Sequence, residues 1–328
     1  DEHSGHEPTV MSTCPACAAA VVAGASFCEA CGAGLDVLAE GPTCGECGTR
    51  ATEDSDGYCA VCGHRLPGPR DHLAIDLATA AGVTDRGRRH HHNEDAMAVA
   101  LIENGSAIVV CDGVSTTANS ELASRAAADA ALDVLARPGV EPAQAMLEAA
   151  AAARRAVAGV PSAGPGAGNP SCTFVAALVQ ADDVTVGWLG DSRAYWLGSD
   201  PRLLTSDHTW AAEVAASGEM TIEQAVADPR GGSITRWIGV DAPDIEPSIA
   251  RFRFAAGVLL VCADGLWISA PDAAALATHP ALHERELIEQ AGALVRFANE
   301  SGGHDNITVV LSQVGAMPAT SLGSAAQA

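Results

Sequence analysis

The chain has 328 residues, of which 48% are hydrophobic, and a formal net charge of −23 at pH 7. This length suits one large domain and a small one. The acidic excess argues against binding to nucleic acid, whose phosphates favour basic patches, and against an anionic membrane surface. No apolar stretch is long enough to span a membrane. Residues 1–12 are acidic, unlike a signal peptide, and are expected to be disordered. We expect a cytoplasmic protein with no nucleic-acid and no membrane partner.

Eight of the eleven cysteines lie in the first 62 residues, as four Cys-x2-Cys pairs. Such a pair directs two thiolates to one point, and a second pair completes a tetrahedral site for Zn²⁺. Because this segment has few large apolar residues, metal binding would supply its folding energy. We predict a double zinc ribbon over residues 13–66 with two structural zinc ions. The predicted ligands are Cys14, Cys17, Cys28, Cys31, Cys44, Cys47, Cys59 and Cys62.

A disulfide framework is the alternative reading of these cysteines, since eight of them permit one in a secreted protein. Cys-x2-Cys pairs form poor disulfides and nothing signals export, so zinc is favoured. Zinc ribbons bind proteins or nucleic acid, and nearby acids such as Glu29 and Glu46 favour a protein partner. The other cysteines, Cys111, Cys172 and Cys262, lie in apolar runs and are predicted to be core residues.

A second domain is predicted over residues 73–315, after a linker at 67–72 that contains two prolines and a glycine. Residues 73–78 alternate like a strand. Two apolar segments, 96–102 and 106–112, flank Asn104–Gly105, which is typical of a β-hairpin turn. The small and polar residues 316–328 are expected to form a flexible tail.

Helices and further strands follow. The alanine-rich segments 121–136 and 141–158 have helical propensity and periodicity. Hairpin-linked strands with helices in pairs indicate an α+β fold built in layers rather than βαβ winding. The remaining predicted strands are 172–180, 184–190, 193–198, 257–263 and 306–314, and the remaining predicted helices are 271–278 and 284–300.

Acidic residues stand where the predicted strands meet loops. Asp95 begins one strand, Asp305 precedes another, and three more acids follow strands: Asp112, Asp191 and Asp264. On one edge of a sandwich their mutual repulsion would be severe without cations. Carboxylate oxygens suit Mg²⁺ or Mn²⁺. The adjacent triplet His90–His92 is not predicted to bind metal, because successive side chains diverge.

Ordered motifs run through the larger domain. They resemble the bacterial form of the metal-dependent protein serine/threonine phosphatases, the type 2C or PPM family, over residues 73–314. The resemblance implies a four-layer α-β-β-α sandwich of two antiparallel sheets, here preceded by a small zinc-ribbon module. The motifs are RRHHHNEDA, VVCDGVS, SCTFVAALV, VGWLGDSRAYWL, LLTSDHTWAAEVAASGEM, ITRWIG, LLVCADGLW and GGHDNITVVL.

The resemblance also implies an activity. The enzyme would hydrolyse phosphoserine and phosphothreonine monoesters on proteins, the products of a serine/threonine kinase, with two or three Mn²⁺ or Mg²⁺ ions activating a bridging water. Asp112 would bridge two ions, and Asp191 would hold a third, looser one. Asp112, Asp95 and His90 would be catalytic. By position, the implied metal ligands are Glu94, Asp95, Asp112, Gly113, Asp191, Asp264 and Asp305.

One position departs from the family pattern. His90 stands where the family usually has an arginine that holds the substrate phosphate. A protonated histidine binds phosphate, but it lacks the guanidinium fork and loses its charge near neutral pH. We assign substrate binding to His90, with Arg88 or Arg89 able to reach in. The alternative is a low-activity or inactive pseudophosphatase that binds phosphopeptides or acts as an adaptor through the zinc ribbons.

Residues Ser206–Gly239 correspond to the family's variable flap. Within it, Thr221–Gln224 reads as a capping box that begins a short helix. Arg193 and Arg236 match family motifs and are interpreted as structural, as is His208.

Overall fold

The computed structural model describes residues 10–14, 16–22, 27–33, 44, 46–49, 57–162, 164, 168–243 and 246–315. Most of the predicted N-terminal segment, residues 1–9, and the predicted tail, 316–328, lie outside the described residues. The chain divides into two compact units, Asp1–Gly68 and Pro69–Ala328. Among the described residues, no helix has the length and apolar character needed to cross a membrane.

The first unit is built from cysteine turns. Strands β1 (Val10–Thr13) and β2 (Ala20–Val22) pair antiparallel around the first turn. In that turn the Ala18 amide donates to the Cys14 carbonyl at 2.8 Å. The other three turns repeat this bond, and each places a glycine at positive φ where the first has Ala18. The first cysteine of each turn is buried and the second is exposed.

The second unit contains a five-stranded antiparallel sheet in the order β13-β9-β8-β6-β5. The predicted hairpin turn at Asn104 is confirmed, since Ile102 pairs with Gly105 and Asn104 has a φ of 59°. The strands are β5 (Asp95–Ile102), β6 (Gly105–Asp112), β8 (Phe174–Gln180), β9 (Asp183–Leu189) and β13 (Ser248–Arg253). A separate two-stranded ladder pairs β7 (Ser171–Cys172) with β12 (Ile238–Gly239), and β7 directly precedes β8 in the chain.

A six-stranded antiparallel sheet in the order β11-β10-β14-β15-β4-β3 forms the other half of the sandwich. Its central strand β15 pairs with both β14 and β4, so it is buried on two sides. The strands are β3 (His72–Asp76), β4 (Ala80–Asp85), β10 (Arg193–Trp196), β11 (Arg202–Leu203), β14 (Gly257–Cys262) and β15 (Ile307–Val314).

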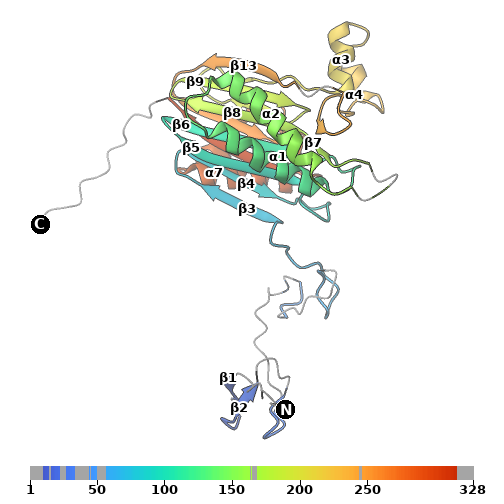
Figure 1. The fold of residues 1–328 in the computed structure, drawn as a ribbon, viewed down its shortest axis with the longest axis vertical. Helices are drawn as coiled ribbons and strands as arrows, with labels where there is room; N and C mark the ends of the chain where they lie inside the picture. The colour runs from blue at the N-terminus through green and yellow to red at the C-terminus, as the bar shows by residue number, and fades with distance from the viewer. Residues whose placement is uncertain are drawn as a thin grey trace, which may run out of the picture. The chain divides into compact units, whose positions relative to one another are not determined.

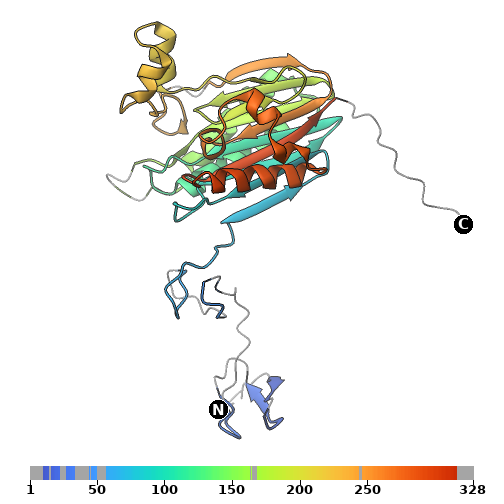
Figure 2. The same ribbon diagram turned by 180° about the vertical axis from the view of Figure 1, so that it is seen from behind.

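Helices cover the outer face of each sheet. The alanine-rich helices α1 (Ser120–Leu135) and α2 (Pro142–Ala158) lie across the five-stranded sheet (Figure 1). Helix α7 (Leu287–Glu300) lies across the six-stranded sheet, as the view from behind shows (Figure 2). Shorter helical segments accompany it: α5 (Asp264–Trp267), α6 (Ala273–Ala277) and the 3₁₀ turn Pro280–His283.

The hydrophobic core lies in three layers, because each sheet buries both of its faces. Between the sheets, Ile108 and Val175 of one sheet pack in the same cluster as Leu259 and Val310 of the other. Two further clusters lie outside the sandwich interior, and each of them joins one sheet to the helices that cover it. The predicted α-β-β-α sandwich of two antiparallel sheets is therefore confirmed.

The flap stands apart from the sheets at one end of the second unit (Figure 1). It holds two short helices, α3 (Trp210–Ser217) and α4 (Ile222–Ala227). The predicted capping box is confirmed: the Gln224 amide donates to Thr221 Oγ1, and the Thr221 amide donates to Gln224 Oε1.

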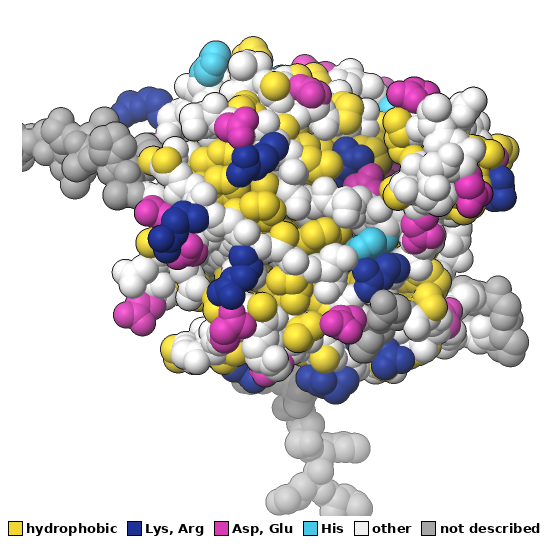
Figure 3. Space-filling model, turned by 90° about the horizontal axis from the view of Figure 1, so that it is seen from above, with side chains coloured by type: hydrophobic (Ala, Val, Ile, Leu, Met, Phe, Trp, Pro, Cys, Tyr) yellow, Lys and Arg dark blue, Asp and Glu magenta, His cyan; other side chains and the backbone are white. Residues whose placement is uncertain are grey.

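Charges of both signs are mixed on the face of the second unit shown in Figure 3, where arginine and acidic side chains alternate with hydrophobic ones. Positive charge therefore does not gather into one patch on this face, as it does on proteins that bind the phosphate backbone.

Candidate metal and catalytic site

Strand ends bring the predicted acids to one end of the sandwich. Asp95, the first residue of β5, pairs directly with Asp112, the last residue of β6. Asp191 follows β9, and Asp264 follows β14. Asp305 precedes β15, whose first residue pairs with the end of β4. The antiparallel register therefore places all five acids at the same end, from strands of both sheets.

A chain of buried hydroxyl and amide groups orients Asp95. Thr308 Oγ1 donates to Asp95 Oδ2 at 2.7 Å and lies 2.7 Å from Thr84 Oγ1. Asn93 Nδ2 donates to Thr84 Oγ1 at 2.9 Å, and Asn93 Oδ1 accepts from the Asp95 amide at 3.2 Å. Sequence reasoning missed Asn93, Thr84 and Thr308. Thr84 and Thr308 were marked only as polar residues in apolar runs, and Asn93 stands among histidines and acids, where nothing singles it out.

Asn306 ties the acidic loop to Asp305. Its Oδ1 accepts from the Glu94 amide at 2.7 Å, and its Nδ2 donates to the carbonyls of Arg86 and His92 at 2.8 and 3.0 Å. The Asn306 amide donates to Asp305 Oδ1 at 2.8 Å. One side chain thus holds the loop that carries Glu94 in register with the strand that follows Asp305.

The acids strongly perturb one another. Burial raises the pKa of Asp95 to about 7, and the charges of Asp305 and Glu94 add to the effect. Burial raises the pKa of Asp191 to about 6, with a contribution from the charge of Asp207. The pKa values of Asp112 and Asp264 lie well above the usual range for aspartate, first because of burial and then because of neighbouring carboxylates.

The chemistry of this cluster fits divalent cations. Within the described part of the chain, the buried Oδ1 atoms of Asp95 and Asp264 have no hydrogen-bond donor. Buried carboxylates without donors or positive partners are costly, and a cation relieves both the desolvation and the repulsion. Among the described residues, no three carboxylates bring one oxygen each within 4.8 Å of one another, so the acids do not converge on one point as closely as the cysteines do.

Gly113 allows the chain to turn away from Asp112 at this point. A Cβ atom there would lie 2.8 Å from the Glu94 carbonyl and 2.8 Å from the Ser120 carbonyl. The Gly113 amide donates to the Glu94 carbonyl at 3.1 Å, and the Ser115 hydroxyl donates to Glu94 Oε2. The close backbone approach keeps Glu94 beside Asp112.

His90 contacts the acidic cluster, whereas the arginines just before it in the sequence do not. His90 Nε2 lies 3.1 Å from Asp305 Oδ1, so this ring faces a predicted metal ligand. Arg88 and Arg89 are exposed, and neither forms an ion pair with the described acids. Arg86 instead contacts Asp71 at 3.3 Å and donates to the His90 carbonyl. The geometry therefore brings His90, but not Arg88 or Arg89, to the acids.

The eight cysteines of the first unit gather into two separate groups. All four ligand atoms in each group lie within 4.8 Å of one another: Cys14, Cys17, Cys28 and Cys31, and then Cys44, Cys47, Cys59 and Cys62. The Thr49 hydroxyl, 3.2 Å from Cys47 Sγ, and the Thr49 amide lower the pKa of that thiol to about 6. Thiolates grouped in this way are suited to Zn²⁺.

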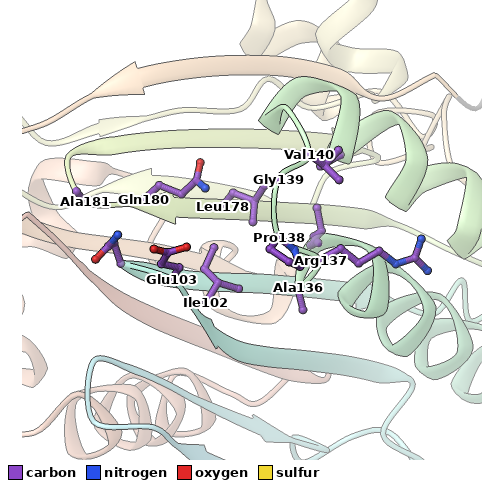
Figure 4. A pocket seen from close by; sticks show the side chains of 13 residues that line it. Ile102, Glu103, Ala136, Arg137, Pro138, Gly139, Val140, Leu178, Gln180 and Ala181 are labelled. Atoms are coloured by element: carbon purple, nitrogen blue, oxygen red, sulfur yellow. The ribbon is translucent and has the colours of Figure 1, made fainter.

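A cavity of about 380 Å³ lies at the opposite end of the five-stranded sheet from the acids. Figure 4 shows it between the β5–β6 turn and the loop after α1, with Glu103, Arg137 and Gln180 at its rim. Strand β5 begins at Asp95 and ends at Ile102, which lines this cavity. None of the predicted site residues contributes to it.

Known proteins are similar to this chain in sequence and in fold. A profile of the family "Protein phosphatase 2C" matches residues 84–281. The serine/threonine phosphatase stp of Listeria innocua is 32% identical over 236 residues, covering 70% of this chain and 92% of that protein. PstP of Mycobacterium tuberculosis is 29% identical over 238 residues, covering 71% of this chain and 44% of that protein.

Solved structures agree with the sequence matches. The crystal structure of Mycobacterium tuberculosis PstP/Ppp has a TM-score of 0.63 at 27% identity, covering 72% of this chain and 98% of that one. The catalytic domain of PstP in complex with two manganese ions has a TM-score of 0.59 at 25% identity, covering 74% of this chain and 99% of that one. These likenesses do not favour the inactive adaptor alternative. The chain belongs to the protein phosphatase 2C family of metal-dependent enzymes.

Proposed function

We propose that the chain removes phosphate from phosphoserine and phosphothreonine residues of proteins at a centre of two Mn²⁺ or Mg²⁺ ions. The observation that carries this proposal is the set of aspartates at one end of the sandwich, with raised pKa values and buried oxygens that lack donors. The named relatives are serine/threonine phosphatases, and one related structure contains two manganese ions.

The proposed roles follow from position. Asp112 pairs directly with Asp95 in the sheet, and burial and then the charges of Asp95 and Asp264 raise its pKa, so Asp112 would be shared between two ions. Asp264 and Asp305, with the Gly113 carbonyl, would complete the shell of the first ion. Glu94 and Asp95 would hold the second. Asp191 would hold a third, looser ion.

When bound, the divalent ions lower the pKa of water and neutralise charge on the phosphoryl oxygens. The protein's own residues supply position. The Thr308 hydroxyl fixes which oxygen of Asp95 faces away from the cluster, and Asn306 holds the loop of Glu94 against Asp305. Fixed carboxylates need no reorganisation when phosphate charge develops, which lowers the barrier.

His90 is the proposed phosphate contact of this enzyme. Its ring already faces Asp305, so it borders the space where a phosphoryl group would meet the ions. An arginine would offer two parallel N–H donors to phosphate, whereas a histidine offers one at a time.

We expect the substitution His90→Arg to raise kcat/KM for a phosphothreonine peptide by about tenfold, mainly through KM, because a bidentate charged contact replaces a weaker one. The measurement is Mn²⁺-dependent phosphate release at pH 8. The matched control is His91→Arg, which adds the same charge at the exposed neighbouring position. Equal rates for wild type and His90→Arg would mean that a group other than His90 holds the phosphate.

We also propose that each cysteine group binds one structural Zn²⁺. Support comes from sulfur distances such as 3.7 Å between Cys14 and Cys31 and 3.5 Å between Cys44 and Cys62, a spacing that a shared tetrahedral ion requires. Cysteines that bind zinc rather than form disulfides are typical of reducing compartments, which favours the predicted cytoplasmic location.

Metal analysis separates the two kinds of site. We expect the purified chain to contain two zinc ions after mild chelation, which removes Mn²⁺ and abolishes hydrolysis of p-nitrophenyl phosphate; added Mn²⁺ should restore the activity. Cys44→Ser should lower the zinc content by one ion, because three ligands hold zinc poorly. The matched control is Cys111→Ser, in the buried core of the second unit, which should leave zinc unchanged. Equal zinc content in both variants would contradict the assignment.

Several finer points stay predictions. The domain limits 13–66 for the zinc ribbons and 73–315 for the phosphatase domain are proposed, as is a serine/threonine kinase that makes the substrate. A protein partner at the zinc ribbons is favoured by exposed apolar side chains next to the cysteines: Phe27 is 63% exposed and Val61 is 66% exposed.

A further inference from the structure

We propose that Trp267, Arg193 and Asp207 form a positioning unit for Asp191, here called the Asp191 clamp. The clamp would set the affinity of the third cation site and tie that site to the base of the flap. This inference rests on the proposed role of Asp191 as a metal ligand. It concerns residues outside the acidic cluster that hold one of its members in place.

The clamp begins with a backbone contact. The indole Nε1 of Trp267 donates to the Asp191 carbonyl at 2.9 Å. Trp267 is the last residue of α5, the short helical turn whose first residue is Asp264. One helical turn thus carries a proposed ligand of the first ion at its start and the donor that holds Asp191 at its end. The short helix α5 and the Trp267 hydrogen bond therefore link the position of Asp264 to that of Asp191.

Arg193 fixes the indole ring. Its guanidinium carbon lies 3.7 Å from the centroid of the Trp267 ring, a distance typical of a cation–π contact. Arg193 Nε and Nη2 donate to the two oxygens of Asp207 at 2.9 and 2.6 Å, and Nη1 donates to the Tyr195 hydroxyl at 3.0 Å. The Arg193 and Asp207 side chains are only 13% and 15% exposed.

This arrangement gives Arg193 a role other than phosphate binding. Three of its nitrogens donate to protein groups and its face is stacked on Trp267, so the guanidinium is committed to the clamp. A bidentate pair with this little solvent exposure holds its geometry better than a surface ion pair does. The clamp is therefore rigid, and it transmits the position of Asp207 to the Asp191 carbonyl through the indole ring.

The residue after Asp207 holds the other side of Asp191. The His208 amide donates to the Gly190 carbonyl at 2.9 Å, and the Gly190 amide donates to His208 Nδ1 at 3.2 Å. Gly190 has a φ of 103°, a conformation that side chains disfavour. The segment that carries Asp191 is thus fixed on both sides, by Trp267 and by Asp207–His208.

Asp207 and His208 also lie at the start of the flap. Thr209 follows His208 and caps α3, with its hydroxyl accepting from the Ala212 amide at 3.3 Å. Helix α3 is the first helix of the flap. If the base of the flap moved, the groups that hold Asp191 in place would move first. The groups that hold the ligands on β5 and β6 would be affected later. The third cation site is the one that the flap can modulate.

The test is calorimetric titration of Mn²⁺ into the full-length chain after mild chelation, with zinc retained. Trp267→Phe keeps a ring under Arg193 but removes the indole donor. We expect it to weaken only the loosest Mn²⁺ site, by about fivefold, which corresponds to one hydrogen bond. Asp207→Asn should weaken the same site at least as much, and it remains informative if Trp267→Phe does not fold. Asp191→Asn should remove the site.

A matched ion pair provides the control. Asp183 accepts from Arg253 Nε and Nη2 at 2.9 and 2.7 Å, the same bidentate geometry as in the clamp, but at the far end of β9. Asp183→Asn should leave all Mn²⁺ sites unchanged. If Asp191→Asn removes a site while both clamp variants bind Mn²⁺ like wild type, the clamp is overturned and the proposed metal centre stands. If Asp191→Asn removes no site, the assignment of Asp191 fails and the clamp with it.

Discussion

Replacing Asp112 with asparagine is expected to lower Mn²⁺-dependent phosphate release by about a thousandfold or more, as removal of a central electrostatic group does, and to make the metal-free protein melt at a higher temperature. Activity falls because the amide carries no charge to hold two ions together. Stability rises because Asp112 is buried among Asp95, Asp264 and other acids, which raises its pKa well above the usual range. An asparagine imitates the protonated form without having to take up a proton on folding.

The opposite signs of these two effects are what distinguish a metal site from a structural carboxylate. A structural aspartate would lose stability when replaced. The measurements are p-nitrophenyl phosphate hydrolysis with saturating Mn²⁺ and thermal melting in chelator at pH 7.5. Asp183→Asn, which removes an exposed carboxylate at the far end of β9, should retain full activity. An Asp112→Asn protein that keeps a tenth of wild-type activity, or that melts lower without metal, would contradict the bridging role.

The sequence was sufficient to predict where the acids meet, because each strand end was marked by a change from apolar residues to an acid. Asp112 follows the apolar run of β6, and Asp264 follows that of β14. Antiparallel pairing then requires strand starts and strand ends to share one edge, as the pairing of Asp95 with Asp112 does. The grouping of the cysteines could also be predicted from the sequence, since a spacing of two residues defines a local turn.

Other elements depend on distant parts of the chain and could not be read locally. Strand β4 (Ala80–Asp85) begins with two alanines and a glycine, which have weak strand preference, and it forms because β3 and β15 pair on its two sides. Strand β13 was missed because it is an edge strand that carries arginines. Helix α3 had local signals that were overlooked, a Thr209 cap and Gly218 in the left-handed conformation.

The supporting network was the hardest part to foresee. Thr308 and Asn93 are separated by more than two hundred residues of sequence, yet both bond to Thr84. Their pairing is fixed by the packing of β4 between β3 and β15, and a single sequence contains no record of it. Carboxylates at strand ends leave a local pattern, whereas the hydroxyls and amides that orient them do not.

The stability of the metal-free protein should fall as pH rises from about 4 to 7, the window set by the unfolded and folded pKa values of Asp95, 3.8 and about 7. The folded state holds this proton more tightly than the unfolded state does. The stabilisation of the folded state that comes from this tighter proton binding is therefore fully present below the unfolded pKa. It is lost as pH rises through the folded pKa. Asp191, with a pKa of about 6, acts in the same direction up to pH 6. For a domain of this size the loss should be on the order of 10 °C in melting temperature.

Saturating Mn²⁺ should reverse this trend, because the ions bind the deprotonated carboxylates and replace the protons. The increase in melting temperature that Mn²⁺ causes should therefore grow from pH 5 to pH 8. Taking the difference between metal-loaded and metal-free melting at each pH cancels the titration of histidines and surface acids, which both forms share. In Asp112→Asn this difference should be small and nearly independent of pH. A wild-type difference that is already at its maximum at pH 5 would mean that the carboxylates are ionised in the metal-free protein, and that the cluster does not hold the protons that the ions are expected to displace.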